Sequence, residues 1–221
     1  MPRQALIFGA TGAVGRELLE LCLDGDRYSR VNVIARRPAP LEHEKLHWIE
    51  AEFDALHGLE PVSGMVGGDA YCCLGTTIKV AGSEAAFRRV DHDFVLNSAR
   101  FAKECGARQF SMVSALGANA ESSNLYNRTK GEVETAVAAE GFPSLRIFRP
   151  SLLKGERDEF RLGEKIGNGV SFLLTPLFHL GLRRYQPVEI SKLARALYVS
   201  ADDDRSNGAL YVFESDEIQT Y

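Results

Sequence analysis

Short apolar runs rich in β-branched and aromatic residues alternate along the chain with longer segments whose apolar residues recur every three or four positions. The short runs predict strands, and the longer segments predict amphipathic helices. The predicted strands are residues 4–8, 30–35, 47–51, 70–74, 108–113, 145–148 and 210–213. The predicted helices are residues 13–23, 83–105, 124–139 and 189–199. This alternation predicts an α/β fold, a doubly wound parallel sheet with helices on both faces.

The alternation loosens after Pro150, where glycine-rich loops replace it as far as residue 186. A length of 221 residues suits a single domain, and no internal repeat or low-complexity linker divides the chain. We therefore predict one domain over residues 1–221, in which residues 151–186 form a small C-terminal segment that covers the substrate. Apolar residues of that segment could line a substrate pocket or a homodimer interface, and the sequence leaves both open: Phe172, Leu173, Leu174, Leu177, Phe178 and Leu180.

Composition and charge narrow the classes of function. The chain is 45% hydrophobic and 25% charged, which is ordinary for a globular protein. Its net charge of −4 argues against a nucleic-acid partner, because binding to a polyanion needs a basic face. The cysteines have no C-x-x-C or metal-ligand spacing, which suits a reducing compartment. Because the sequence also has neither a signal-peptide pattern nor an apolar stretch of membrane-spanning length, we expect a cytoplasmic protein without a membrane partner.

Residues 43–47 match the H-E-x-x-H pattern of zinc proteases. That pattern binds zinc when both histidines lie on one helix and a third ligand is close by. Here Pro38 and Pro40 precede the pattern, strand-like residues follow it at once, and no third ligand is evident. We therefore predict no metal site.

A glycine motif follows the first predicted strand directly and opens the first predicted helix. Its spacing, G-x-x-G-x-x-G, is a variant of the Rossmann dinucleotide fingerprint, in which glycines allow a tight turn, close approach of a pyrophosphate and close packing of helix and sheet. The N-terminus of the helix adds free N–H donors and a favourable dipole. The predicted pyrophosphate-binding residues of this Rossmann-type fold are Gly9, Thr11, Gly12, Ala13, Val14 and Gly15.

The second predicted strand ends in Arg36 and Arg37, where NAD-selective sites usually carry Asp or Glu for the ribose hydroxyls. Two guanidinium groups suit a 2′-phosphate and leave a bare ribose without its usual acceptor. The alternative is a solvated end of a strand. We favour NADP, as NADPH, over NAD.

Tyr126 and Lys130 lie four residues apart on a predicted helix and therefore share one face. A free phenol has a pKa of about 10, and a nearby ammonium favours the phenolate, which would make Tyr126 an acid/base near neutral pH. Ser114 ends the fifth predicted strand, at the sheet edge where such folds bind ligands, and its hydroxyl could polarise a carbonyl. We predict that Ser114, Tyr126 and Lys130 share one crevice with the glycine loop; the alternative makes Tyr126 and Lys130 ordinary surface residues.

With these motifs the sequence resembles the short-chain dehydrogenase/reductase superfamily, in its atypical branch that includes the Tat-interacting oxidoreductase-like proteins. The resemblance covers most of residues 4–200. Its motifs are residues 9–15, 34–37, 72–77, 81–84, 90–93, 126–134 and 148–150, of which the Cys-Cys-Leu-Gly-Thr-Thr run at 72–77 is much more specific than the glycine loop.

The resemblance implies roles for individual residues. Leu74, Gly75 and Thr76 would lie along the cofactor, and residues 149–153 would close over the nicotinamide. Tyr126 would be the proton donor, and Lys130 would hold the nicotinamide ribose and lower the pKa of the phenol. Two positions depart from the family pattern: Ala115 stands where many members have a second serine, and no residue clearly matches the relay Asn found in other branches, for which Asp91 and Asn97 are the candidates.

Together these features predict an NADPH-dependent oxidoreductase that transfers hydride to the carbonyl of a small molecule, whose identity the sequence does not give. The alternative is a non-catalytic NADPH-binding regulator, whose affinity for a partner would follow its cofactor occupancy. A nucleotide-sugar epimerase is disfavoured, because only about 70 residues follow the predicted strand 145–148, too few for a substrate lobe.

Overall fold

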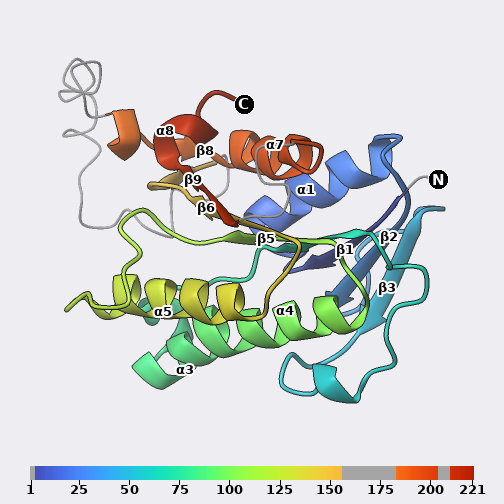
Figure 1. Ribbon diagram of the computed structural model, residues 1–221, viewed down its shortest axis with the longest axis horizontal. Helices are drawn as coiled ribbons and strands as arrows, with labels where there is room; N and C mark the ends of the chain where they lie inside the picture. Colours follow the sequence, from blue (N-terminus) through green and yellow to red (C-terminus); the bar gives the residue numbers. More distant parts are fainter. Residues whose placement is uncertain (1–2, 156–182, 204–209) are drawn as a thin grey trace.

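The computed structural model describes residues 3–155, 183–203 and 210–221. Within them, seven strands form one parallel sheet in the order β3-β2-β1-β4-β5-β6-β9 (Figure 1). The strands are β1 (Arg3–Phe8), β2 (Tyr28–Ala35), β3 (Leu46–Glu50), β4 (Asp69–Cys72), β5 (Gln109–Val113), β6 (Ser144–Arg149) and β9 (Leu210–Glu214). The strand order reverses between β1 and β4, and open α/β sheets bind ligands at the C-terminal ends of the strands beside such a reversal.

Helices cover both faces of the sheet (Figure 1). On one face α1 (Ala13–Asp24) packs against α7 (Ile190–Ser200), and on the other α4 (Phe94–Glu104) packs against α5 (Leu125–Ala139). The shorter elements are α2 (Ile78–Ala81), α3 (Glu84–Arg88), α8 (Ser215–Ile218), the turns η1 (Leu56–Gly58), η2 (Arg89–Asp93) and η3 (Arg183–Tyr185), and the paired strands β7 (Leu153–Lys154) and β8 (Val188–Glu189).

The two layers of helices explain why the strands are continuous apolar runs. In β1, Ala5 and Ile7 pack into the core beneath α1 and α7, whereas Leu6 and Phe8 pack into the core beneath α4 and α5. All four side chains are fully buried. A strand covered on both faces has no solvent side on which to place polar residues.

The predicted fold class is confirmed, as are all seven predicted strands, although several of their ends shift. The helix predicted over residues 83–105 is present as a continuous run from Glu84 to Glu104, but its middle turn, η2, is π-helical and divides it into α3 and α4. A π-helical turn is wider than a regular one, so it rotates the residues after it about the helix axis. In η2 it accompanies the burial of a charged residue, Asp91, which the apolar periodicity does not reveal.

The predicted substrate-covering segment spans residues 151–186. Residues 156–182 lie outside the described residues, and with them the apolar residues between 172 and 180.

Candidate functional site

The glycine loop joins β1 to α1 at the C-terminal edge of the sheet, with Thr11 within it. Gly9 has a φ of +84°, and a Cβ there would lie 2.8 Å from the carbonyl carbon of Cys73. A Cβ at Gly15 would lie only 2.1 Å from the carbonyl oxygen of Gly9. Both positions therefore need glycine, because a side chain would collide with backbone atoms.

The first turn of α1 contains the predicted residues Ala13 and Val14, and Val14 is buried in the core. Gly12 stands at the N-cap, where no side chain accepts a hydrogen bond from the helix. The N–H groups of a first turn have no partner within their helix. The loop thus presents backbone donors in the arrangement that binds phosphate groups at helix N-termini.

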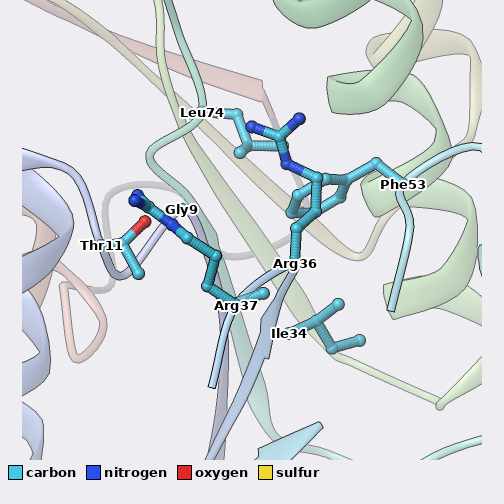
Figure 2. Close-up of a pocket in the computed structure, with 8 residues that line it drawn as sticks. Gly9, Thr11, Ile34, Arg36, Arg37, Phe53 and Leu74 are labelled. Atoms are coloured by element: carbon cyan, nitrogen blue, oxygen red, sulfur yellow. The ribbon is translucent and has the colours of Figure 1, made fainter. Parts of the chain in front are cut away.

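A pocket opens between this loop and the end of β2 (Figure 2). In Figure 2 the side chain of Arg37 points toward Thr11, and that of Arg36 toward Leu74. Three sets of predicted cofactor residues thus meet here: the glycine loop, the arginine pair and Leu74. The residues that line the pocket are Gly9, Thr11, Ile34, Ala35, Arg36, Arg37, Phe53 and Leu74.

Three residues that line the pocket were not predicted as cofactor residues: Ile34 and Ala35, which precede the arginine pair, and Phe53. Phe53 follows β3, the third parallel strand, and therefore reaches the same edge of the sheet as the ends of β1 and β2. Its position just after a strand was the available signal, since ligand-contacting residues gather at the C-terminal ends of such strands.

The pocket is cationic at the arginine pair. Arg36 and Arg37 are both exposed, and within the described part of the chain neither guanidinium forms an ion pair. Asp54, which follows the pocket residue Phe53, pairs with Arg89 instead. None of the described residues that line the pocket is a carboxylate, so its lining offers positive charge to a bound anion.

Lys130 lies on α5 and is almost completely buried. Its Nζ lies 2.7 Å from Oδ1 of Asp91 on η2. The other carboxylate oxygen, Oδ2, accepts a hydrogen bond of 2.8 Å from the backbone N–H of Thr76, in the loop that follows β4. Lys130 therefore lies beside the predicted cofactor residues Gly75 and Thr76. Asp91 contacts both Lys130 and the backbone of Thr76.

Tyr126 lies one turn before Lys130 on α5, a helix that the side chain of Asn124 caps by accepting from the N–H of Asn127. Its ring stacks on that of Phe87, with 5.6 Å between the ring centroids. The structure gives its hydroxyl no hydrogen-bond partner among the described residues, in contrast to Lys130 and Ser114. A partly buried phenol without an internal partner can hydrogen-bond to a ligand.

Ser114 follows β5 and is buried. Its hydroxyl donates a hydrogen bond of 2.5 Å to Oε1 of Glu134 on α5. Arg149 holds the same carboxylate through Nε, at 3.0 Å from Oε1, and through Nη2, and it also contacts Glu214. The hydrogen bonds that Arg149 donates to Glu134 raise the pKa of the guanidinium. The hydroxyl proton of Ser114 thus points to Glu134, and donation to a substrate carbonyl would require it to turn.

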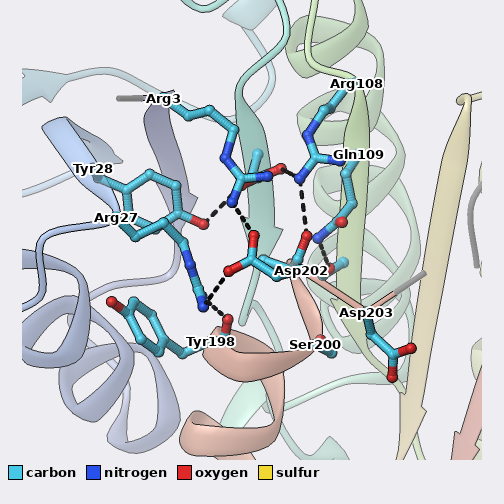
Figure 3. Close-up of polar contacts among 12 residues, drawn as sticks. Arg3, Arg27, Tyr28, Arg108, Gln109, Tyr198, Ser200, Asp202 and Asp203 are labelled. Atoms are coloured by element: carbon cyan, nitrogen blue, oxygen red, sulfur yellow. Dashed lines mark hydrogen bonds and ion pairs between the residues drawn. The ribbon is translucent and has the colours of Figure 1, made fainter. Parts of the chain in front are cut away.

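A second polar cluster lies at the opposite, N-terminal edge of the sheet (Figure 3). Its centre is Asp69, the first residue of β4, which is fully buried. The Asp69 carboxylate accepts from the hydroxyl of Tyr28 at 2.9 Å and pairs with Arg108 at 3.0 Å and Arg3 at 3.4 Å. Arg3 also pairs with Asp202 after α7. This cluster ties the ends of five elements together, β1, β2, β4, β5 and α7, far from the glycine loop, and we interpret it as structural.

The Asp69 cluster predicts a pH dependence of stability. Burial raises the pKa of the Asp69 carboxyl to about 6, although Arg3 and Tyr28 act in the opposite direction. The folded protein therefore holds this proton more tightly than the unfolded chain, and the resulting stabilisation is full below about pH 4 and is lost as the pH rises through about 6.

We expect a loss on the order of 3 kcal/mol over that range. The measurement is the free energy of unfolding of the wild type and of Asp69→Asn from about pH 4 to about pH 7. The free energy of unfolding of the wild type minus that of Asp69→Asn should fall as the pH rises. A value that stays constant would contradict the assignment.

Residues 43–47, which match the zinc-protease pattern, lie on a turn and at the start of β3. The Nδ1 of His47 contacts Oδ1 of Asn32 on the neighbouring strand. Within the ranges that the structure describes, no group of three or more potential metal ligands comes together, and no helix there has the length and apolar character needed to cross a bilayer.

No protein-family model matches the chain. Among curated proteins, Protein HTATIP2 of Rattus norvegicus is 38% identical over 164 residues, which are 73% of this chain and 67% of the rat protein. Protein FMP52, mitochondrial, of Eremothecium gossypii is 34% identical over 223 residues and covers 97% of this chain and 95% of its own. These alignments include most of both sequences, so they concern the whole domain rather than one motif.

Solved structures share the fold at low sequence identity. WbmH of Bordetella bronchiseptica, in complex with NAD+, superposes with a TM-score of 0.67 at 17% identity and covers 96% of this chain and 75% of its own. A short-chain dehydrogenase/reductase superfamily protein from Agrobacterium tumefaciens, with bound NAD, gives 0.65 at 13% identity and covers 96% and 77%. At these identities the likeness concerns the fold.

The relatives correct one prediction. The expectation of a cytoplasmic protein is contradicted, since the FMP52 proteins of Eremothecium gossypii, Candida albicans and Scheffersomyces stipitis are named mitochondrial. Cysteine spacing reports only that the thiols are reduced, and more than one compartment keeps them so. With the parallel sheet, the glycine loop between β1 and α1, and a curated relative that is 38% identical, the chain belongs to the atypical short-chain dehydrogenases/reductases, in the branch of the HTATIP2-like proteins.

Proposed function

We propose that this protein is an NADPH-dependent oxidoreductase that reduces the carbonyl group of a small-molecule substrate. The observation that carries the proposal is the pocket in which the glycine loop meets two guanidinium groups that form no ion pair with the described residues. A dinucleotide phosphate needs backbone donors for its pyrophosphate and cations for its 2′-phosphate, and the lining of this pocket offers both kinds of group.

The residues of the loop fit a pyrophosphate. Side chains at Gly9 and Gly15 would collide with backbone atoms, so the chain keeps glycine at both positions and the turn stays compact. The uncapped first turn of α1 leaves N–H groups and a helix dipole for the phosphates. Gly9, Thr11, Gly12, Ala13, Val14 and Gly15 would hold the pyrophosphate, and Leu74, Gly75 and Thr76 would lie along the remainder of the cofactor.

Arg36 and Arg37 would select NADPH over NADH. Replacing both with alanine is expected to lower the affinity for NADPH roughly 10²- to 10⁴-fold, because each of the two charge-assisted hydrogen bonds to a phosphate contributes about 1.5 to 3 kcal/mol. The affinity for NADH should change little. Titration with each dinucleotide, monitored by nicotinamide fluorescence, measures both effects.

Arg30→Ala is the matched control, since Arg30 is exposed on the same strand but lies near its other end. It should leave both affinities unchanged. Tighter binding of NADH than of NADPH by the wild type would refute the role given to the arginine pair.

When bound, the nicotinamide dinucleotide supplies the hydride. Tyr126 would donate the proton to the substrate oxygen, since its hydroxyl has no partner among the described residues. Lys130, one turn later on α5, would hold the ribose on the nicotinamide side. Ser114 would orient the substrate oxygen once its hydroxyl turns from Glu134.

A second candidate is a non-catalytic NADPH-binding regulator. The observation in its favour is that two of the three predicted catalytic groups are engaged internally: Ser114 by Glu134, and Lys130 by Asp91. This candidate predicts tight binding of NADPH, no turnover of any aldehyde, ketone or quinone in a panel, and affinity for a partner that changes with the cofactor. Oxidation of NADPH that depends on an added carbonyl compound would exclude it.

A further inference from the structure

A buried ion pair lies beneath the loop predicted to contact the cofactor. The side chains of Lys130 and Asp91 are 4% and 1% exposed, and the ammonium nitrogen lies 2.7 Å from the carboxylate oxygen. The two residues come from elements that meet only in the folded protein, α5 and the π-helical turn η2. Two charges removed from water in this way are strongly coupled, because removal of either leaves the other uncompensated.

The pair is also connected to the loop after β4. The backbone N–H of Thr76 donates to the second oxygen of Asp91. A Cβ at Gly75 would lie 3.5 Å from Oδ1 of Asp91 and 3.8 Å from Nζ of Lys130, which places Gly75 directly against the pair. One carboxylate therefore fixes the position of the lysine relative to Gly75 and Thr76.

The groups that act on the charge of Lys130 come from three elements: Asp91 on η2, Tyr126 on α5 and Cys72 on β4. Burial raises the pKa of the Cys72 thiol to about 12, so this group is neutral at physiological pH. Burial by itself would lower the pKa of Lys130, but Asp91 and then Tyr126 act in the opposite direction, and the net pKa is raised. Asp91 is the carboxylate among these groups.

We propose that Asp91 is a positioning residue of the cofactor site, which holds the Lys130 ammonium against Gly75 and Thr76 and keeps it charged for a ribose hydroxyl. The assignment of the ribose rests on the proposed function, whereas the control of the lysine charge does not. An ammonium carries several N–H donors, so the contact with Asp91 leaves others for a ligand. Without Asp91 the same buried lysine would lose its proton at a lower pH.

The charge of Lys130 can be measured without cofactor or substrate. In protein labelled with ¹³C-lysine, the Cε signal of Lys130 is assigned by its absence in Lys130→Met and is then followed as the pH is raised. In the wild type the signal should show no deprotonation up to at least about pH 10, near the pKa of an unperturbed lysine. In Asp91→Asn the lysine should titrate at a pH lower by one unit or more, an estimate of roughly the smallest shift expected when a buried cation loses its partner.

Binding of NADPH gives the second readout. Between about pH 7 and about pH 10 the affinity of the wild type should change little, whereas that of Asp91→Asn should fall roughly tenfold for each unit by which the pH exceeds the lowered pKa of Lys130. Asp93→Asn is the matched control, because Asp93 is exposed in the same turn and contacts His92. It should behave as the wild type in both measurements. A merely structural role of Asp91 would change the melting temperature but neither pH profile.

If Asp91→Asn fails to fold, Asp91→Glu is measured in its place. This variant keeps the carboxylate on a longer side chain and should keep most of the lysine charge. Deprotonation of Lys130 below about pH 9 in the wild type would overturn the proposal. So would a lysine that stays charged in Asp91→Asn to the same pH as in the wild type. If the wild type bound no NADPH, the proposed function would fail, while the titration of Lys130 would still decide whether Asp91 sets its charge.

Discussion

Replacing Tyr126 with phenylalanine is expected to lower kcat roughly 10²- to 10⁴-fold, the usual contribution of a positioned general acid. The affinity for NADPH should stay that of the wild type. Phenylalanine keeps the ring that stacks on Phe87 and removes only the hydroxyl, so α5 and its capping residue Asn124 should be undisturbed. The measurements are NADPH oxidation with a carbonyl compound that the wild type reduces, and fluorescence titration with NADPH.

The matched control is Tyr198→Phe, which removes a tyrosine hydroxyl from α7 on the other face of the sheet. It should turn over at the wild-type rate. If Tyr126→Phe kept more than about a tenth of the activity, the proton would have to come from another group. Loss of both activity and NADPH affinity would show instead that the substitution disturbed the fold of the site.

Replacing Gly15 with alanine is the second substitution with a large expected effect. The new Cβ would lie 2.1 Å from the carbonyl oxygen and 2.8 Å from the carbonyl carbon of Gly9, and both are backbone atoms. Relief of this overlap must move α1 away from the end of β1, which should destabilise the fold by about 1 to 3 kcal/mol or more. The same movement would spoil the phosphate-binding turn, so we expect the affinity for NADPH to fall at least roughly tenfold.

Gly58→Ala is the matched control for Gly15→Ala, because a Cβ at Gly58 would meet nothing within 4 Å. It should preserve both the melting temperature and the affinity for NADPH. Both variants are compared by thermal unfolding and then by titration at a temperature where each is fully folded. An unchanged melting temperature and affinity in Gly15→Ala would show that α1 does not need to approach β1 this closely.

The regular part of the fold could be predicted from local pattern. The strands are apolar runs because both faces of the sheet are covered, and the helices carry one apolar stripe. The irregular turn within the helix predicted over residues 83–105 could not be predicted. This turn, η2, accompanies a polar contact, between Asp91 and Lys130, that apolar spacing does not record.

The candidate site, too, could be predicted from the sequence only in part. The glycine loop and the arginine pair were predicted because each lies within a few residues of a strand end, and parallel strands bring their C-terminal ends to one edge. Phe53 was missed because it follows a short loop after β3 and belongs to no motif. The proton of Ser114 was expected to face a substrate, whereas the structure directs it to Glu134, which follows it by 20 residues in the chain.

The sequence by itself determined the order of strands and helices, the class of fold and the glycine loop between β1 and α1. These depend on local spacing, which a single chain displays directly. Only the tertiary structure decided which carboxylate meets which predicted catalytic residue: Asp91 for Lys130 and Glu134 for Ser114. A buried charge requires a partner in space, and the free energy of that pairing depends on a distance between side chains that their separation along the chain does not set.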